Sequence, residues 1–126
     1  MGKVLGVGGV FFKTADVAAT KAWYGRVLGI EAGDWGAYFP PLPKGGTAWN
    51  PSKADSDHFK PSEAPFMINY VVDDLDSLLA HVRAEGVEVL GEPEAMEGIG
   101  RFAWILDPAG VKIELWEPED EPPAAA

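Results

Sequence analysis

The first half of the chain shows a strand pattern followed by a helix pattern. Residues 4–13 are mostly apolar and lead directly into a helix start, which predicts a buried strand. Asp16 stands where a helix N-cap is needed, and Gly29 stands where a left-handed C-cap would end that helix. Prolines and glycines then interrupt the pattern, which predicts only short strands over 35–39 and 47–50.

The second half repeats this order of elements. Residues 66–73 are rich in β-branched and aromatic side chains and predict a strand. Asp74 is placed to cap a second helix, whose leucines and valine recur at helical spacing until Gly86. A further strand is expected over 87–90, and a loop over 92–98.

A hairpin is predicted over residues 100–106 and 111–116, because the Asp-Pro-Ala-Gly between them has the residue preferences of a type I turn. Strand–helix–strand–strand–strand thus occurs twice. We expect an α+β fold in which two tandem βαβββ modules form one curved mixed sheet around a cleft. The predicted parts are module one at about 4–50, a linker at 51–65 and module two at 66–118, all within a single domain over 1–118, with a flexible acidic tail at 119–126.

Composition narrows the classes of partner. A length of 126 residues is typical of one domain, and 47% hydrophobic residues is the value of an ordinary folded protein. The absence of cysteine excludes a disulfide scaffold, a thiolate metal site and a cysteine nucleophile, and is compatible with a cytoplasmic location. A net charge of −10 disfavours nucleic acid and anionic lipid, and no apolar run is long enough to span a membrane. We therefore expect a cytoplasmic protein with neither kind of partner.

Strand alternation sorts side chains between the helices and the cleft. Because side chains on a strand point alternately to the two faces, Val10, Phe12, Ile113 and Leu115 are expected to face the helices. The opposite face forms an apolar, aromatic pocket with a few polar groups, which is typical of a small-molecule site. The predicted ligand-binding residues are Phe11, Trp49, Met67, Asn69, Phe102, Trp104, Glu114 and Trp116, with Arg101 at the mouth as either an anion anchor or a solvated charge.

Three segments resemble the vicinal oxygen chelate superfamily, which includes glyoxalase I, bleomycin resistance proteins and extradiol dioxygenases. They are DVAATKAWYGRVLG at 16–29, VDDLD at 72–76 and DPAGVKIELW at 107–116, and the similarity extends over residues 4–118. The resemblance implies the paired-module fold and a homodimer. It does not select one activity, because the superfamily contains lyases, isomerases, epimerases, dioxygenases and proteins that only bind antibiotics.

The resemblance also implies where a metal ion would be bound. Metal-dependent members place His, Gln or Glu ligands at positions that correspond to Gly9, Trp49, Met67 and Glu114 in this chain. Only Glu114 has a side chain that can ligate a divalent ion, whereas protein metal sites normally use three or more ligands. We therefore predict no metal site and no cofactor, while a divalent ion bound through a different set of ligands stays open.

Two functional classes follow. In the first, the protein binds a small, largely apolar or aromatic molecule in its aromatic cleft without catalysis. In the second, it is a lyase or isomerase of the glyoxalase type that uses Glu114 as a metal ligand or as a general base. Glu114 itself is either a rim carboxylate paired with a lysine or a cleft carboxylate among aromatic rings. Whether the protein is an enzyme, and whether modules pair within one chain or across a dimer, stays open.

The linker carries one of the two histidines. His58 follows Asp55-Ser56-Asp57, and this cluster has no recognisable ligand spacing, so a solvated linker histidine is the expected state. The linker at 51–65 is also a candidate lid over the cleft, with Phe59 reaching in.

Overall fold

Two helices cover one face of a four-stranded sheet in the computed structural model, which describes residues 2, 3, 5 and 7–119. The helices are α1 (Val17–Leu28) and α2 (Leu75–Ala84), and a short 3-10 turn, η1, spans Asp57–Phe59. The strands are β1 (Met67–Val71), β2 (Glu94–Met96), β3 (Gly100–Leu106) and β4 (Lys112–Pro118). Their order is β1-β4-β3-β2, with β1 parallel to β4 and the other pairs antiparallel, so the sheet is mixed as predicted.

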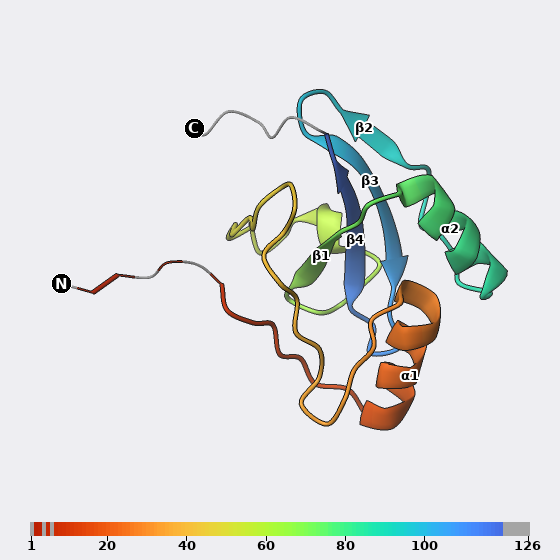
Figure 1. Ribbon diagram of the computed structural model, residues 1–126. Helices are drawn as coiled ribbons and strands as arrows, with labels where there is room; N and C mark the ends of the chain where they lie inside the picture. The colour runs from red at the N-terminus through yellow and green to blue at the C-terminus, as the bar shows by residue number, and fades with distance from the viewer. Residues whose placement is uncertain (1, 4, 6, 120–126) are drawn as a thin grey trace.

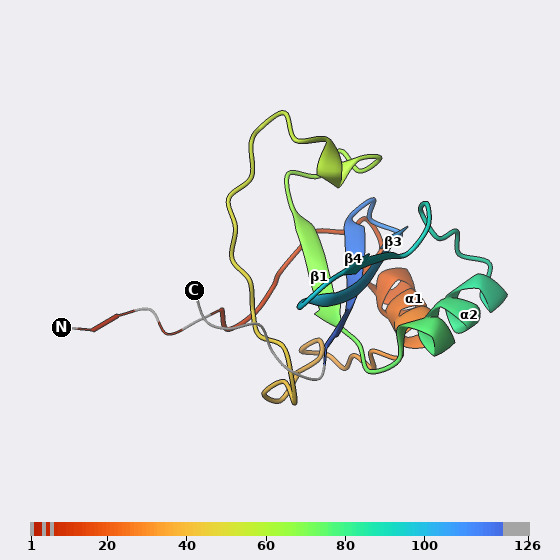
Figure 2. The same ribbon diagram turned by 90° about the horizontal axis from the view of Figure 1, so that it is seen from above.

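The sheet separates the helices from the long connection between α1 and β1. Figures 1 and 2 both show α1 and α2 on one side of the sheet and the 51–65 segment on the other. Within the part of the chain that the structure describes, the connection therefore lies over the second face of β1, β4 and β3. The α+β class is confirmed, with a curved open sheet and two helices. The proposed module boundaries stay a prediction.

Both predicted helix starts and the hairpin are confirmed, because local chemistry determines them. Asp16 Oδ1 accepts from the Ala19 N–H at 2.9 Å, and Gly29 ends α1 with a φ of +71°, a conformation that glycine adopts without a Cβ clash. Asp74 caps α2 in the same way. The core beneath the helices is contiguous. It consists of Tyr24, Val27, Leu75, Leu79, Val82, Ala103, Ile105, Ile113 and Leu115.

The strands predicted for the first module are not formed in the part of the chain that the structure describes. Residues 2, 3, 5 and 7–13 form no strand, and positions 4 and 6 of that prediction lie outside the described residues. The predicted strands at 35–39 and 47–50 are also absent, apart from an isolated bridge between Gly33 and Gly36. A strand needs a partner to complete its ladder, and these three segments do not pair with one another or with the sheet.

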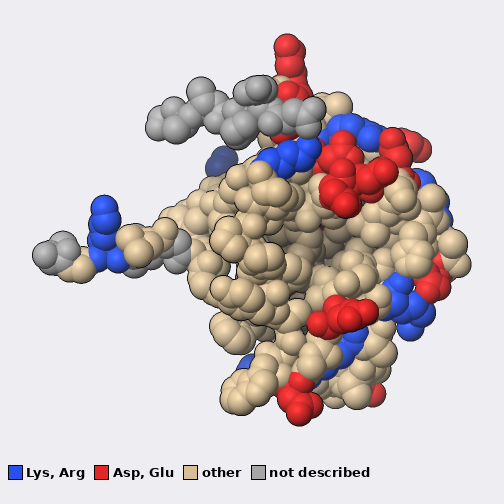
Figure 3. Space-filling view, viewed as in Figure 1, with Lys and Arg blue, Asp and Glu red and all other residues tan. Residues whose placement is uncertain are grey.

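The unpaired segments leave large apolar side chains exposed. Phe12 packs against the core as alternation predicted, but Val10 is more than half exposed and Trp35 fully so. In Figure 3 the middle of the visible face is formed by residues without charge, and acidic groups lie towards its margins.

The strand predicted over 87–90 was placed too early. That segment donates one ladder-like bond, from Leu90 N to Trp104 O at 2.8 Å, and then turns at Gly91. The strand that follows α2 is β2, which lies within the predicted loop at 92–98 and pairs Glu94 with Phe102. It is an edge strand whose three side chains are all exposed, so it carries no apolar pattern that the sequence could show.

The predicted tail at 119–126 lies outside the described residues except for Glu119. No helix in the described ranges combines the length and the apolar character that a bilayer crossing requires.

Candidate binding site on the open face of the sheet

Three rows of side chains cross the face of the sheet that the helices leave free. Strand register pairs Asn69 with Glu114 and Glu114 with Trp104, so these three residues form the central row. The flanking rows are Met67–Lys112–Leu106 on one side and Val71–Trp116–Phe102 on the other. The period of two places Ile113 and Leu115 under the helices, fully buried, and directs the residues between them to this open face. Alternation from the sequence predicted these faces on β1, β3 and β4.

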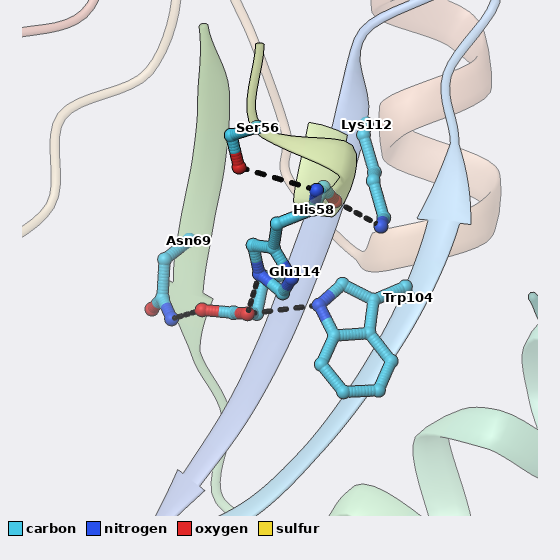
Figure 4. A network of polar contacts seen from close by, with 6 residues as sticks. All are labelled: Ser56, His58, Asn69, Trp104, Lys112 and Glu114. Carbon is cyan, nitrogen blue, oxygen red and sulfur yellow. Dashed lines mark hydrogen bonds and ion pairs between the residues drawn. The ribbon is translucent and has the colours of Figure 1, made fainter. Parts of the chain in front are cut away.

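Glu114 is the centre of the polar contacts on this face. Its Oε1 accepts from Asn69 Nδ2 at 2.8 Å, and its Oε2 accepts from Trp104 Nε1 at 2.8 Å. The side chain is only 14% exposed, so the carboxylate lies among the rings rather than at a solvated rim. Figure 4 shows the two donors approaching it from the neighbouring strands on either side. Of the two predicted states of Glu114, the geometry matches the cleft carboxylate.

The aromatic residues beside Glu114 form a parallel array. The ring planes of Phe102 and Trp104 differ by 12°, with centroids 6.4 Å apart, and those of Phe102 and Trp116 differ by 4° at 6.0 Å. Trp116 is fixed further by a hydrogen bond from its Nε1 to Ile99 O at 3.0 Å. Parallel, offset rings at these separations are a favoured aromatic geometry. Because the three rings are nearly parallel, a planar molecule that packs on this face meets rings of the same orientation.

His58 lies at this face although the sequence placed it in a solvated linker. Its Nε2 is 3.3 Å from Glu114 Oε2, and its ring stands at 88° to the Trp104 indole with centroids 5.9 Å apart. A hydrogen bond in this contact requires the tautomer of His58 that carries a proton on Nε2, because a carboxylate oxygen accepts. The linker sequence contains no signal that pointed to this contact, because 56 residues separate His58 from Glu114.

Lys112 holds the same turn from the other side. Its Nζ donates to the His58 carbonyl and lies 5.7 Å from the centroid of the Trp104 ring. Burial lowers the pKa of Lys112, while the negative charge of Glu114 opposes that change. The η1 turn therefore rests on the open face through both the side chain and the carbonyl of His58 (Figure 4). The candidate lid thus lies over the site in this structure, but His58 rather than Phe59 makes these contacts.

Three predicted site residues are not at this face. Phe11 is 94% exposed and Trp49 is 79% exposed, because the segments that carry them do not join the sheet. Arg101 lies on the helix face of β3, where its Nη2 donates to Asp76 Oδ1 on α2 at 2.8 Å. This pairing lowers the pKa of Asp76. Its predicted position at the cleft mouth was wrong, because Arg101 and Phe102 are adjacent on a strand and must point to opposite faces.

The residues present do not fit the metal site that the resemblance implies. Met67 is on the open face but has a thioether, and Gly9 and Trp49 offer no ligand atom. Glu114 already accepts an N–H donor at each oxygen. Over residues 2–3, 5 and 7–119, no group of three or more His, Asp or Glu side chains gathers as a metal ion would need.

Comparison with known proteins identifies the family. A model of the Glyoxalase/Bleomycin resistance protein/Dioxygenase superfamily matches residues 7–115. The chain belongs to this superfamily. The resemblance seen in the three sequence segments is thereby confirmed, as is the glyoxalase type of fold. The match includes the segments at 7–13, 35–39 and 47–50, which form no paired strand here.

Individual relatives agree with this assignment. A protein of Mycobacterium bovis named "Putative glyoxylase CFP32" is 29% identical over 113 residues, which is 87% of this chain and 35% of the relative. The chain thus spans about a third of the length of the curated relatives it matches. A structure from the mobile metagenome of V. pseudocholerae covers 95% of this chain and 99% of its own, with a TM-score of 0.59 and 21% identity. TnmS3, an antibiotic binding protein from Streptomyces, covers 84% and 89% with a TM-score of 0.50 and 25% identity.

Proposed function

We propose that this protein binds a small, largely apolar or aromatic molecule on the open face of its sheet, without a catalytic metal. The observation that carries the proposal is the parallel array of Phe102, Trp104 and Trp116 beside the Glu114 carboxylate. The rings supply a stacking surface, and Glu114 with Asn69 supplies the few polar groups that orient a ligand. The similarity to TnmS3, which is named an antibiotic binding protein, supports the same class of function.

The proposal is tested with a planar aromatic probe. 1-Naphthalenemethanol is titrated calorimetrically into the wild-type protein, Trp104→Leu and Trp35→Leu. Trp35 is the matched control, because it is fully exposed and does not lie on the β1, β4 and β3 rows. We expect saturable binding that Trp104→Leu weakens about tenfold, since a lost aromatic contact costs on the order of 1.4 kcal/mol. Binding that Trp35→Leu and Trp104→Leu reduce equally, or no binding at all, would reject the proposal.

Metal dependence is a separate part of the proposal. Probe affinity is expected to be the same before and after treatment with EDTA, because the contacts proposed for the ligand are rings and the Glu114 carboxylate. A loss of affinity on chelation that Zn²⁺ or Ni²⁺ restores would contradict this part and favour the enzyme class.

One observation favours an alternative function. His58 Nε2 and Glu114 Oε2 lie 3.3 Å apart, which places an imidazole beside a carboxylate as acid–base catalysis requires. In a lyase or isomerase of the glyoxalase type, Glu114 would act as the general base or as a metal ligand. The test is turnover of the hemithioacetal of methylglyoxal and glutathione, compared with Glu114→Gln. Turnover that Glu114→Gln abolishes would establish this alternative, and its absence in the wild type would exclude that reaction.

A homodimer is also proposed. Phe11, Trp35 and Tyr38 expose nearly their whole side chains, an exposure that a soluble monomer rarely combines in neighbouring unpaired segments. Pairing of those segments across two chains would cover them and could bring Phe11 and Trp49 to the aromatic face. Light scattering after size exclusion should give twice the 13.5 kDa of one chain, and a mass of one chain would refute the dimer.

A further inference from the structure

Two nitrogen groups of the chain itself converge on Glu114 and Trp104. The imidazole of His58 lies against the carboxylate and stands perpendicular to the indole. The ammonium of Lys112 lies over the same indole ring, 5.7 Å from its centroid. A carboxylate beside an aromatic ring is the combination that attracts a nitrogen cation, through charge on one side and the ring quadrupole on the other.

We propose that Glu114 Oε2 and the Trp104 ring form a subsite for a protonated nitrogen of the ligand, and that His58 occupies this subsite until the ligand displaces it. This inference rests on the proposed function and adds a chemical class to it: an aromatic molecule that carries an ammonium or a similar N–H cation. His58 is then the residue that sets this specificity, since a ligand must replace its contact with Glu114.

The contact of Glu114 with His58 is weaker than its contacts with Asn69 and Trp104, as displacement of His58 by a ligand requires. Asn69 Nδ2 and Trp104 Nε1 each lie 2.8 Å from an oxygen and come from strands of the sheet. His58 Nε2 lies at 3.3 Å, its side chain is 51% exposed, and it comes from a three-residue 3-10 turn in the linker. Displacement of His58 therefore leaves the carboxylate held by two rigid donors, with Oε2 open to a new donor.

The charge balance favours a cation over a neutral molecule or an anion. The donors from Asn69 and Trp104 are uncharged, so they orient the carboxylate without neutralising it. The nearby Lys112 ammonium donates its hydrogen bond to the His58 carbonyl, so that bond is not directed at Glu114. The chain as a whole has a net charge of −10, which draws cations towards it and repels anions.

The experiment uses three naphthalene probes that share one ring system. 1-Naphthylmethylamine is a cation at pH 7, 1-naphthalenemethanol is neutral and 1-naphthoate is an anion. Each is titrated calorimetrically into the wild type, Glu114→Gln, His58→Ala and His81→Ala. His81 is the matched control, because its Nε2 contacts Arg26 O between the two helices, on the other side of the sheet.

The expected results separate the two residues. The wild type should bind the amine about tenfold more tightly than the alcohol, and the naphthoate least of all. Glu114→Gln should remove the preference for the amine, so that the amine and the alcohol bind this variant with similar affinity. His58→Ala should tighten amine binding by about two- to fivefold, because the competing contact is gone and more of the protein has an open subsite. His81→Ala should match the wild type.

Other outcomes overturn the inference. Equal affinity for amine and alcohol in the wild type would do so, as would a preference that persists in Glu114→Gln. Weaker amine binding by His58→Ala would show that His58 contacts the ligand rather than yielding to it. If the alcohol binds through Trp104 without any preference for the amine, the proposed function stands and this inference fails. If none of the three probes binds, both fail.

A second measurement does not depend on the stability of the variants. In the wild type, the ring nitrogen resonances of His58 and His81 are followed by NMR during titration with each probe. Displacement predicts that the His58 signals shift with the amine and change much less with the alcohol, while those of His81 stay constant. Constant His58 signals at saturating amine would refute displacement.

Discussion

Replacement of Tyr24 by Phe tests how the first helix is attached to the hairpin that carries the site. The Tyr24 hydroxyl donates to Asp107 Oδ2 at 2.5 Å, across 83 residues of sequence. Asp107 is nearly fully buried, and its Oδ1 accepts from the N–H groups of Ala109 and Val111, which shapes the turn between β3 and β4. One carboxylate thus joins α1 to the turn that sets the register of Trp104 opposite Glu114.

The expected loss in the free energy of unfolding follows from the group that Tyr24→Phe removes. Phe keeps the ring and hence its packing against Phe12 and Trp23, so only the hydroxyl is lost. Hydrogen bonds to charged groups contribute about 1.5–3 kcal/mol, and the buried Oδ2 would lose this partner in the variant. We therefore expect Tyr24→Phe to lower the free energy of unfolding by about 2–3 kcal/mol, or the melting temperature by about 8–12 °C for a domain of this size.

Urea unfolding followed by circular dichroism measures the change, with Tyr38→Phe as the control. Tyr38 is 90% exposed, so its hydroxyl should contribute less than about 0.5 kcal/mol. If Tyr24→Phe also stays within about 0.5 kcal/mol of the wild type, the hydroxyl does not stabilise the folded chain and the reasoning about the buried carboxylate is refuted.

Three further predictions concern pH, Gly100 at the start of β3, and Arg101. Burial raises the pKa of Tyr24 and of Tyr70, so above about pH 10 the unfolded chain releases phenolic protons that the folded chain keeps. The free energy of unfolding should therefore fall as pH rises, which urea unfolding measures. Absorbance at about 295 nm follows phenol ionisation in Tyr38→Phe, where Tyr24 and Tyr70 are the only tyrosines. Gly100→Ala should lower the free energy of unfolding by more than about 2 kcal/mol, since φ is +137° and the new Cβ would lie 2.2 Å from the Glu117 carbonyl oxygen. The control Gly98→Ala places its Cβ where no atom lies within 4 Å, so it should cost about 1 kcal/mol. Equal urea midpoints for the two variants would contradict this prediction. Arg101→Met should leave both the urea midpoint and the affinity for 1-naphthalenemethanol unchanged, because the ion pair of Arg101 is exposed and lies on the helix face. Weaker binding of the probe would show that Arg101 belongs to the binding site.

The sequence contained enough information to place Arg101 on the helix face, although the prediction put it at the cleft mouth. Alternation assigned Phe102 and Trp104 to the open face, which required Arg101 to point the other way. His58 is a different case, because nothing in the linker indicates which strand it would contact. Its contact with Glu114 depends on the path of the 51–65 segment across the sheet, and that path is set by distant groups such as Lys112, which holds the His58 carbonyl.

Among the strands, too, some follow from local sequence and others depend on a distant partner. The β3–β4 hairpin followed from its Asp-Pro-Ala-Gly turn, since turn chemistry and alternation act within ten residues. The apolar pattern at 7–13 indicates a capacity to pair, but a ladder needs a second strand within about 5 Å, and the described segments of the first module lack one here.

The sequence by itself determined the helix ends, the hairpin, the two faces of β1, β3 and β4, and the family, because each depends on short-range patterns or on motifs in order. Only the tertiary structure decided that Asn69, Trp104 and His58 meet at one carboxylate, and that Phe11 and Trp49 stay apart from it. Such contacts depend on distances between residues far apart in the chain, and no local pattern contains those distances.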